Sequence, residues 1–145
     1  TNVAAFIAII ALTEAAGTED IAGLRGAAQR SPLVAGCLAL ALLSLTGIPP
    51  TAGFFAKLTV FGVALSQQGM LWLVLLGAVN SVISAFYYIG IIKTMYVNAP
   101  EQADRLPTPW LVQVPLFVAT ALTFAIGVSP QMVLDGAIKA VQLLP

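Results

Sequence analysis

A long apolar run interrupted by two adjacent prolines is the feature that most constrains the fold of this chain. Lys57 is the only charged residue in the range 31–66. At about 1.5 Å per residue, one straight helix over this range would reach about 54 Å, whereas the hydrocarbon core of a bilayer is about 30 Å thick. One straight membrane helix is too long, and two full spans would leave no residues for the turn between them.

The pair Pro49-Pro50 resolves this conflict of lengths. A proline removes a backbone donor and clashes with the preceding helical turn. We therefore predict two half-helices, about 33–47 and 51–66, joined by an unwound segment from Gly47 to Pro50. Unwound backbone at membrane depth is tolerated only where it is buried in protein or lines a hydrated cavity. We expect this broken helix to lie inside a bundle and not against lipid.

Composition supports a membrane protein. Of the 145 residues, 59% are hydrophobic and 8% are charged, against roughly 25% charged residues in soluble domains. The net charge is zero, so the chain has no basic patch for nucleic acid. It has no histidine and one cysteine, which excludes an internal disulfide and a His- or Cys-rich metal site. Groupings typical of covalent catalysis or of redox-cofactor binding are also missing from the sequence.

The remaining segments predict an all-α fold, a polytopic membrane helix bundle with one Pro-broken helix and a C-terminal interfacial helix. The first apolar stretch is short for a span, so we expect the sequence to begin partway through a helix. Pro32 suits a first helical position behind Ser31 as N-cap. The predicted segments are a partial span over 1–13, a loop over 14–31 with a short helix over 21–29, the broken span over 32–66, spans over 70–96 and 110–128, and an amphipathic interfacial helix over 131–144.

The placement of Lys and Arg gives an orientation. The loops over 14–31 and 97–109 fall on one side of the membrane, and the turn near 67–69 and the C-terminal tail on the other. Cytoplasmic loops carry an excess of Lys and Arg. We expect the two loops in the cytoplasm and the C-terminus outside, because the first side holds Arg25, Arg30, Lys93 and Arg105, and the second holds Lys139.

Lys57 is the basic residue that lies within apolar sequence on both sides. A lysine at mid-membrane costs about 2.5–3.5 kcal/mol on insertion scales, so such a charge needs a partner, water or a function. Desolvation favours the neutral amine and hydration the ammonium, so a lysine between these states can take up and release protons. A helix break beside a buried charge is typical of transporter sites. The alternatives are a lysine that snorkels to the headgroups and a kink without function.

A stripe of small and polar residues follows one face of the predicted span over 70–96. Its main members are Asn80, Ser84 and Tyr87, which fall within one arc at 100° per residue. Such residues in membrane helices usually serve helix packing. Packing is the favoured role, and a contribution to a proton path is the alternative.

The stretch from Leu42 to Lys57, with its Gly-Ile-Pro-Pro break, resembles the broken helix of the antiporter-like subunits of respiratory complex I. The stretches 80–88 and 92–96 resemble the next helix of the subunit N family, and 98–102 resembles the loop that follows in bacterial members. Sodium/proton antiporter and membrane hydrogenase subunits share the Pro-Pro and lysine pattern. One departure is Gly90, where the family often has a basic residue.

The resemblance implies that the chain is the C-terminal part of one antiporter-like domain, in a bacterial inner membrane, with Lys57 in the proton-translocating path. NADH, FMN, Fe–S clusters and quinone would bind to other subunits, and this chain would bind no cofactor. Its partners would be lipid and the other membrane subunits of the complex, neighbouring antiporter-like subunits included. Two other hypotheses are a cation/proton antiporter or membrane hydrogenase subunit, and a purely structural helix bundle.

Overall fold

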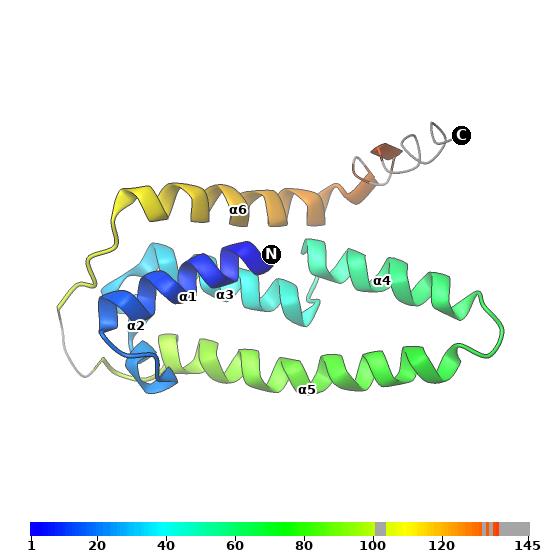
Figure 1. The fold of residues 1–145 in the computed structure, drawn as a ribbon, viewed down its shortest axis with the longest axis horizontal. Coiled ribbons are helices and arrows are strands. Elements are labelled where there is room, and N and C mark those ends of the chain that lie inside the picture. The colour runs from blue at the N-terminus through cyan, green and yellow to red at the C-terminus, as the bar shows by residue number, and fades with distance from the viewer. Residues whose placement is uncertain (101–103, 132, 134, 137–145) are drawn as a thin grey trace.

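The computed structural model describes residues 1–100, 104–131, 133, 135 and 136, and these contain helices and connections without a strand. The all-α prediction is confirmed. The elements are α1 (Asn2–Ala16), the 3₁₀ helix η1 (Ile21–Leu24), α2 (Ala27–Arg30), α3 (Pro32–Thr46), α4 (Ala52–Leu65), α5 (Leu71–Tyr96) and α6 (Trp110–Val128) (Figure 1).

Helix α3 is the centre of the arrangement. It contacts α1, α5 and α6, while α4 contacts α5, α6 and the end of α3. In Figure 1, α5 runs the length of the molecule, with α1 and α3 beside its C-terminal half and α4 beside its N-terminal half. The break between α3 and α4 thus lies about midway along the bundle.

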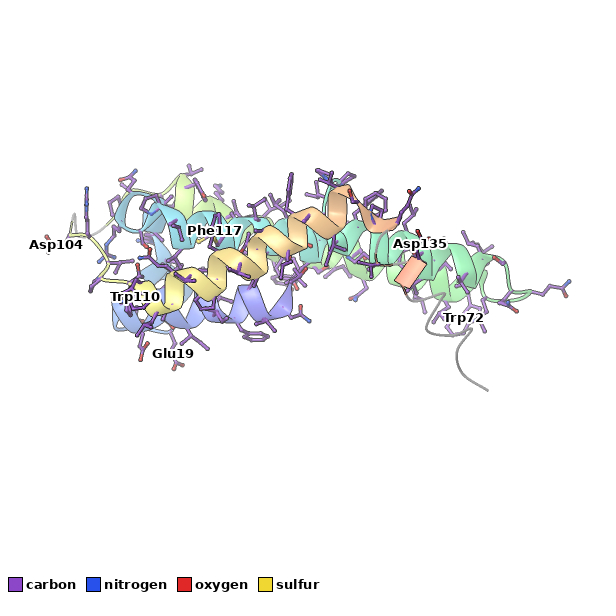
Figure 2. The ribbon with its side chains drawn as sticks, turned by 90° about the horizontal axis from the view of Figure 1, so that it is seen from above. Glu19, Trp72, Asp104, Trp110, Phe117 and Asp135 are labelled. Atoms are coloured by element: carbon purple, nitrogen blue, oxygen red, sulfur yellow. The ribbon has the colours of Figure 1, made fainter. Side chains whose placement is uncertain are left out.

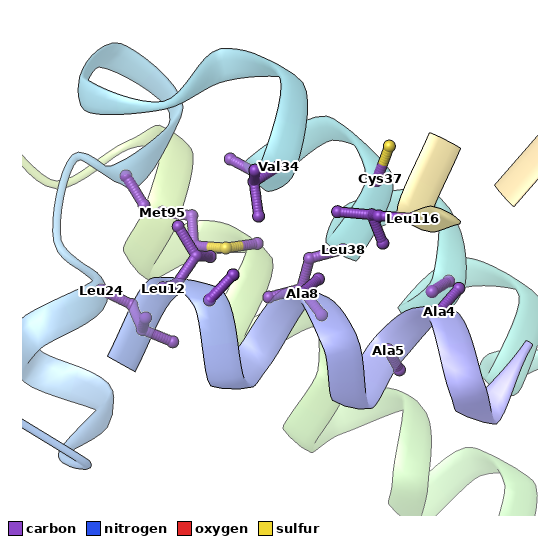
Figure 3. Packing of buried hydrophobic residues seen from close by; sticks show 14 of the residues in the cluster. Ala4, Ala5, Ala8, Leu12, Leu24, Val34, Cys37, Leu38, Met95 and Leu116 are labelled. Carbon is purple, nitrogen blue, oxygen red and sulfur yellow. The ribbon is translucent and has the colours of Figure 1, made fainter. Parts of the chain in front are cut away.

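The hydrophobic core gathers around α1 and α3 (Figure 3). Alanines on α1, such as Ala4 and Ala8, are fully buried and let the two backbones approach. Larger side chains fill the space between the helices. Those buried most completely are Leu12, Val34, Leu38, Met95 and Leu116, which come from α1, α3, α5 and α6.

Helices α5 and α6 are long and apolar enough to cross a membrane, and α1, α3 and α4 are shorter apolar helices. In α5 the only buried residue is Met95, and α4 has none. An apolar helix with so much exposed surface fits a protein whose surroundings are lipid or further membrane helices.

The helix boundaries lie within a few residues of the predicted ranges, with two differences. The single helix predicted over 21–29 is divided into η1 and α2, because Gly26 has φ of 64° and ends the helical path. A Cβ at Gly26 would lie 2.6 Å from Pro100, so a distant loop fixes this turn. Ser31 precedes α3 as predicted, but its hydroxyl pairs with Thr108 Oγ1 at 3.4 Å and does not cap the helix.

The two charged loops lie at the same end of the molecule and are bonded to each other. Arg30 Nε donates to the carbonyl of Asp104 at 2.9 Å, and the Leu106 N–H donates to the carbonyl of Arg30 at 3.2 Å. Figure 2 shows Glu19, Asp104 and Trp110 toward this end and Trp72 toward the other. The predicted interfacial helix over 131–144 lies mostly outside the described residues.

Candidate functional site

The C-terminus of α3 is closed by a glycine turn. Gly47 has φ of 92°, and its N–H donates to the carbonyl of Ser44 at 3.0 Å. The next N–H, of Ile48, donates to the carbonyl of Leu43 at 3.1 Å. This is the Schellman arrangement, which satisfies two of the last carbonyls of a helix. The carbonyls of Leu45 and Thr46 lie beyond it and need another donor.

Lys57 supplies that donor. From the second turn of α4, its Nζ reaches back across the break and donates to the carbonyls of Leu45 and Thr46, each at 2.9 Å. The side chain is half-buried, and among the described residues it has no carboxylate partner. The ammonium therefore lies at the negative end of the α3 dipole, where a cation is favoured.

Gly47 also makes room for the lysine. A Cβ at this position would lie 3.1 Å from Lys57 Cδ and 3.5 Å from Nζ. A larger residue at position 47 would have to adopt a left-handed backbone and crowd the ammonium. The glycine in the Gly-Ile-Pro-Pro sequence thus serves the backbone turn and the lysine together.

The N-terminus of α4 is held by Ser44, a residue of α3. The Gly53 N–H donates to Ser44 Oγ at 3.1 Å, and Thr1 Oγ1 lies 3.1 Å from the same oxygen. Thr51 occupies the N-cap position of α4, but its own hydroxyl donates to the carbonyl of Ile48 at 2.7 Å. A Cβ at Gly53 would overlap the carbonyl of Ser44, so the two backbones touch here.

Helix α6 covers one side of the break. A Cβ at Gly127 would lie 2.5 Å from the carbonyl oxygen of Pro50 and from Thr51 Cα. The Pro49–Pro50 peptide bond is cis. Helix α6 can pass this closely over the connection because position 127 has no side chain.

The structure brings the predicted Gly47, Pro49, Pro50 and Lys57 together at one break. The expectation that the whole broken helix lies inside a bundle agrees with the burial of α3, whereas for α4 it stays a prediction, because the described residues cover α4 only in part. Residues 48–50 are exposed, and none of α4 is buried. The reason is position, because α4 extends beyond the end of α1 and has neighbours on part of its circumference (Figure 1).

The residues of the predicted stripe on α5 differ in their surroundings. Gly77, which lies three residues before Asn80, packs on α4, because Phe61 lies 2.9 Å from where its Cβ would be. Ser84 is half-buried and donates to the carbonyl of Ser81 in its own helix at 3.0 Å. Asn80 and Tyr87 are exposed, and no hydrogen bond joins the described stripe to Lys57. The stripe and the lysine are separate features within this chain.

Ser44 is the site residue that sequence reasoning missed. It is a fully buried polar residue, within hydrogen-bonding distance of Thr1, which precedes α1, and of Gly53 in α4. The available signal was a hydroxyl in the apolar run, three residues before Gly47. Among the described residues, no group of three or more His, Cys, Asp or Glu side chains could hold a metal ion.

Comparison with known proteins identifies the family. Residues 1–84 match the family described as NADH:quinone oxidoreductase/Mrp antiporter, TM. The chain is 37% identical over 144 residues to NADH-quinone oxidoreductase subunit N of Dehalococcoides mccartyi, covering 99% of this chain and 30% of that protein. It is also 37% identical over 150 residues to F(420)H(2) dehydrogenase subunit N of Methanosarcina mazei, covering 97% of this chain and 30% of that protein.

A solved structure agrees with these relatives. The fold matches a chain of respiratory complex I from Thermus thermophilus with bound aureothin, with a TM-score of 0.67 and 34% identity, over 79% of this chain and 26% of that chain. The predicted resemblance to subunit N is confirmed. The chain spans about 30% of the length of the curated relatives described above. It belongs to the NADH:quinone oxidoreductase/Mrp antiporter family of membrane proteins.

Proposed function

We propose that this chain is part of a proton-translocating membrane subunit of a respiratory NADH-quinone oxidoreductase, and that Lys57 is a station of its proton path. The observation that carries the proposal is the lysine ammonium held on two main-chain carbonyls at a helix break. Unwound ends and helix dipoles next to a charge form the ion sites of membrane transporters. The Dehalococcoides mccartyi relative is named NADH-quinone oxidoreductase subunit N.

The redox reaction would take place elsewhere in the complex. NADH, FMN, Fe–S clusters and quinone belong to other subunits in this proposal, and the chain binds none of them. Its contribution is to change the protonation or the partner of Lys57 while electrons pass through the rest of the enzyme. The partners are the other membrane subunits of complex I, including neighbouring antiporter-like subunits, together with lipid.

The proposed location is a bacterial inner membrane, with the charged loops in the cytoplasm and the C-terminus outside. Arg25, Arg30, Lys93 and Arg105 support this orientation, since they belong to the end of the bundle where the two loops are bonded together. Basic residues favour the cytoplasmic side.

A second candidate differs in the electron donor. The Methanosarcina mazei relative is a subunit of an F(420)H(2) dehydrogenase and is as similar to this chain as the subunit N of Dehalococcoides mccartyi. The proton-path proposal for Lys57 is the same in both enzymes. The donor is identified by assaying membranes with each reduced cofactor separately.

The test is Lys57→Ala in the full-length protein within the assembled complex. Proton uptake into inverted membrane vesicles should fall about tenfold or more, as expected when a proton-transferring group is lost. Lys93→Ala is the control, because Lys93 is an exposed lysine at the end of α5. Immunoblots of the native complex should show equal assembly for both variants.

Unchanged proton uptake in an assembled Lys57→Ala complex would exclude Lys57 from the path. Sodium-dependent proton movement without an electron donor or quinone would instead identify a cation/proton antiporter.

A further inference from the structure

The buried hydroxyl of Ser44, on α3, pairs with residues of two other segments at the break. Its Oγ accepts from the Gly53 N–H at 3.1 Å and lies 3.1 Å from Thr1 Oγ1 of the segment that leads into α1. The residue is 0% exposed. A buried hydroxyl that lost these partners would be costly, so the arrangement fixes the three segments relative to one another.

Ser44 and the lysine site form two successive attachments between the same half-helices. Ser44 is followed directly by Leu45 and Thr46, whose carbonyls accept from Lys57. On α4, Gly53 and Lys57 are four residues apart and therefore on one face, separated by about 6 Å along the axis. The first attachment sets the register of α4, and the second depends on that register.

No other described side chain accepts a hydrogen bond from an N–H at the start of α4. The hydroxyl of Thr51, in the N-cap position, donates to the carbonyl of Ile48 and accepts from no N–H of α4. The Ser44 hydroxyl accepts from the Gly53 N–H, as an N-cap side chain would, although it comes from the preceding helix. Without the hydroxyl, the Gly53 N–H would lose this acceptor at the start of α4, one turn before Lys57.

We infer that Ser44 is a positioning residue for Lys57: its hydroxyl holds the start of α4 against the end of α3, so that the ammonium reaches the carbonyls of Leu45 and Thr46. The inference rests on the proposed function, because it gives Ser44 a part in the proton path through Lys57. Ser44 exchanges no proton with the lysine in this scheme.

The experiment compares Ser44→Ala with Ser44→Thr in the full-length protein within the assembled complex. Ser44→Ala should lower proton uptake about two- to tenfold, the factor that corresponds to one hydrogen bond. Ser44→Thr retains the hydroxyl and should restore most of the uptake. Thr120→Ala is the control, because it removes a buried hydroxyl that donates within its own helix at 2.9 Å, and it should leave uptake unchanged.

A double variant separates positioning from general stability. If Ser44 acts through Lys57, Ser44→Ala should add no further loss to the residual uptake of Lys57→Ala. An equal fractional loss in both backgrounds would overturn the inference, as would full uptake by an assembled Ser44→Ala complex. Should Ser44→Ala fail to assemble, Ser44→Cys replaces the hydroxyl by a slightly larger thiol, which is a weaker hydrogen-bonding group. Uptake by Ser44→Cys equal to that of the native complex would then overturn the inference.

The two proposals fail in different ways. Normal uptake by the Lys57→Ala complex removes the proposed function. Impaired uptake by Lys57→Ala together with normal uptake by Ser44→Ala removes only the role of Ser44.

Discussion

The two halves of the broken helix have similar composition but different surroundings. Helix α3 has 15 residues and α4 has 14, and both consist mainly of apolar side chains. Seven residues of α3 are buried: Val34, Ala35, Cys37, Leu38, Ala41, Leu42 and Ser44. In α4 none is buried. Apolar content therefore does not decide which helix forms the core, whereas position in the bundle does.

The comparison also shows what holds α4 in place. Helix α3 is fixed along its length by side-chain packing against three helices. Helix α4 has its closest polar contacts near its start, where Gly53 touches Ser44 and Lys57 reaches the end of α3. The polar contacts that join α4 to α3 therefore lie near the break, and α5 and α6 also contact α4.

The largest difference in stability is expected when the same Leu→Ala substitution is made in α3 and in α4. Leu38 is 0% exposed and Leu58 is 55% exposed. Leu38→Ala should lower the free energy of unfolding by about 2–5 kcal/mol, because it leaves a cavity. Leu58→Ala should change it by about 0.5 kcal/mol or less, as for surface sites. Thermal unfolding of the full-length protein in lipid nanodiscs measures both, and equal losses would mean that the intact protein covers α4 as tightly as α3.

A smaller loss is expected where the two halves touch. Gly53→Ala places a methyl group on the backbone of Ser44 and should destabilise the protein by about 1–3 kcal/mol. Gly62→Ala is the matched control in the same helix, since a Cβ there has no atom within 4 Å. Proton uptake should fall in the first variant and persist in the second. If both variants behave alike, the contact between α3 and α4 does not position the lysine.

The smallest effect is expected on the open face of α5. A Cβ at Gly90 has no atom within 4 Å, so Gly90→Ala should stabilise the helix by about 0.5–1 kcal/mol through lower backbone entropy. Gly90→Lys, which introduces the basic residue common in the family, should be accommodated in the same open space. Thermal unfolding checks both variants, and a clear destabilisation would show that another helix packs closely on this face in the intact protein.

Local steric rules made the break predictable from sequence. Pro49 and Pro50 remove backbone donors wherever they occur, so helix ends near Thr46 and Ala52 follow from the prolines and the flanking glycine. The span Trp110–Val128 likewise matches the predicted range, since its apolar run has polar or proline-containing sequence on both sides.

Contacts between distant segments could not be predicted in the same way. Lys57 bonds to main-chain carbonyls, which every residue has and which leave no mark in the sequence. The division of the loop helix depends on Gly26 meeting Pro100 and on its N–H reaching the carbonyl of Thr94. The hydrogen bond between Ser44 and Gly53 likewise depends on where Gly53 lies in the folded structure, which the sequence does not give.

The two hydrogen bonds of Lys57 end on main-chain carbonyls, those of Leu45 and Thr46. Every residue type has such a carbonyl, so a change of side chain at position 45 or 46 leaves both acceptors in place. The attachment of Lys57 to the end of α3 therefore depends on the backbone path of the glycine turn and not on the identity of the two residues before it.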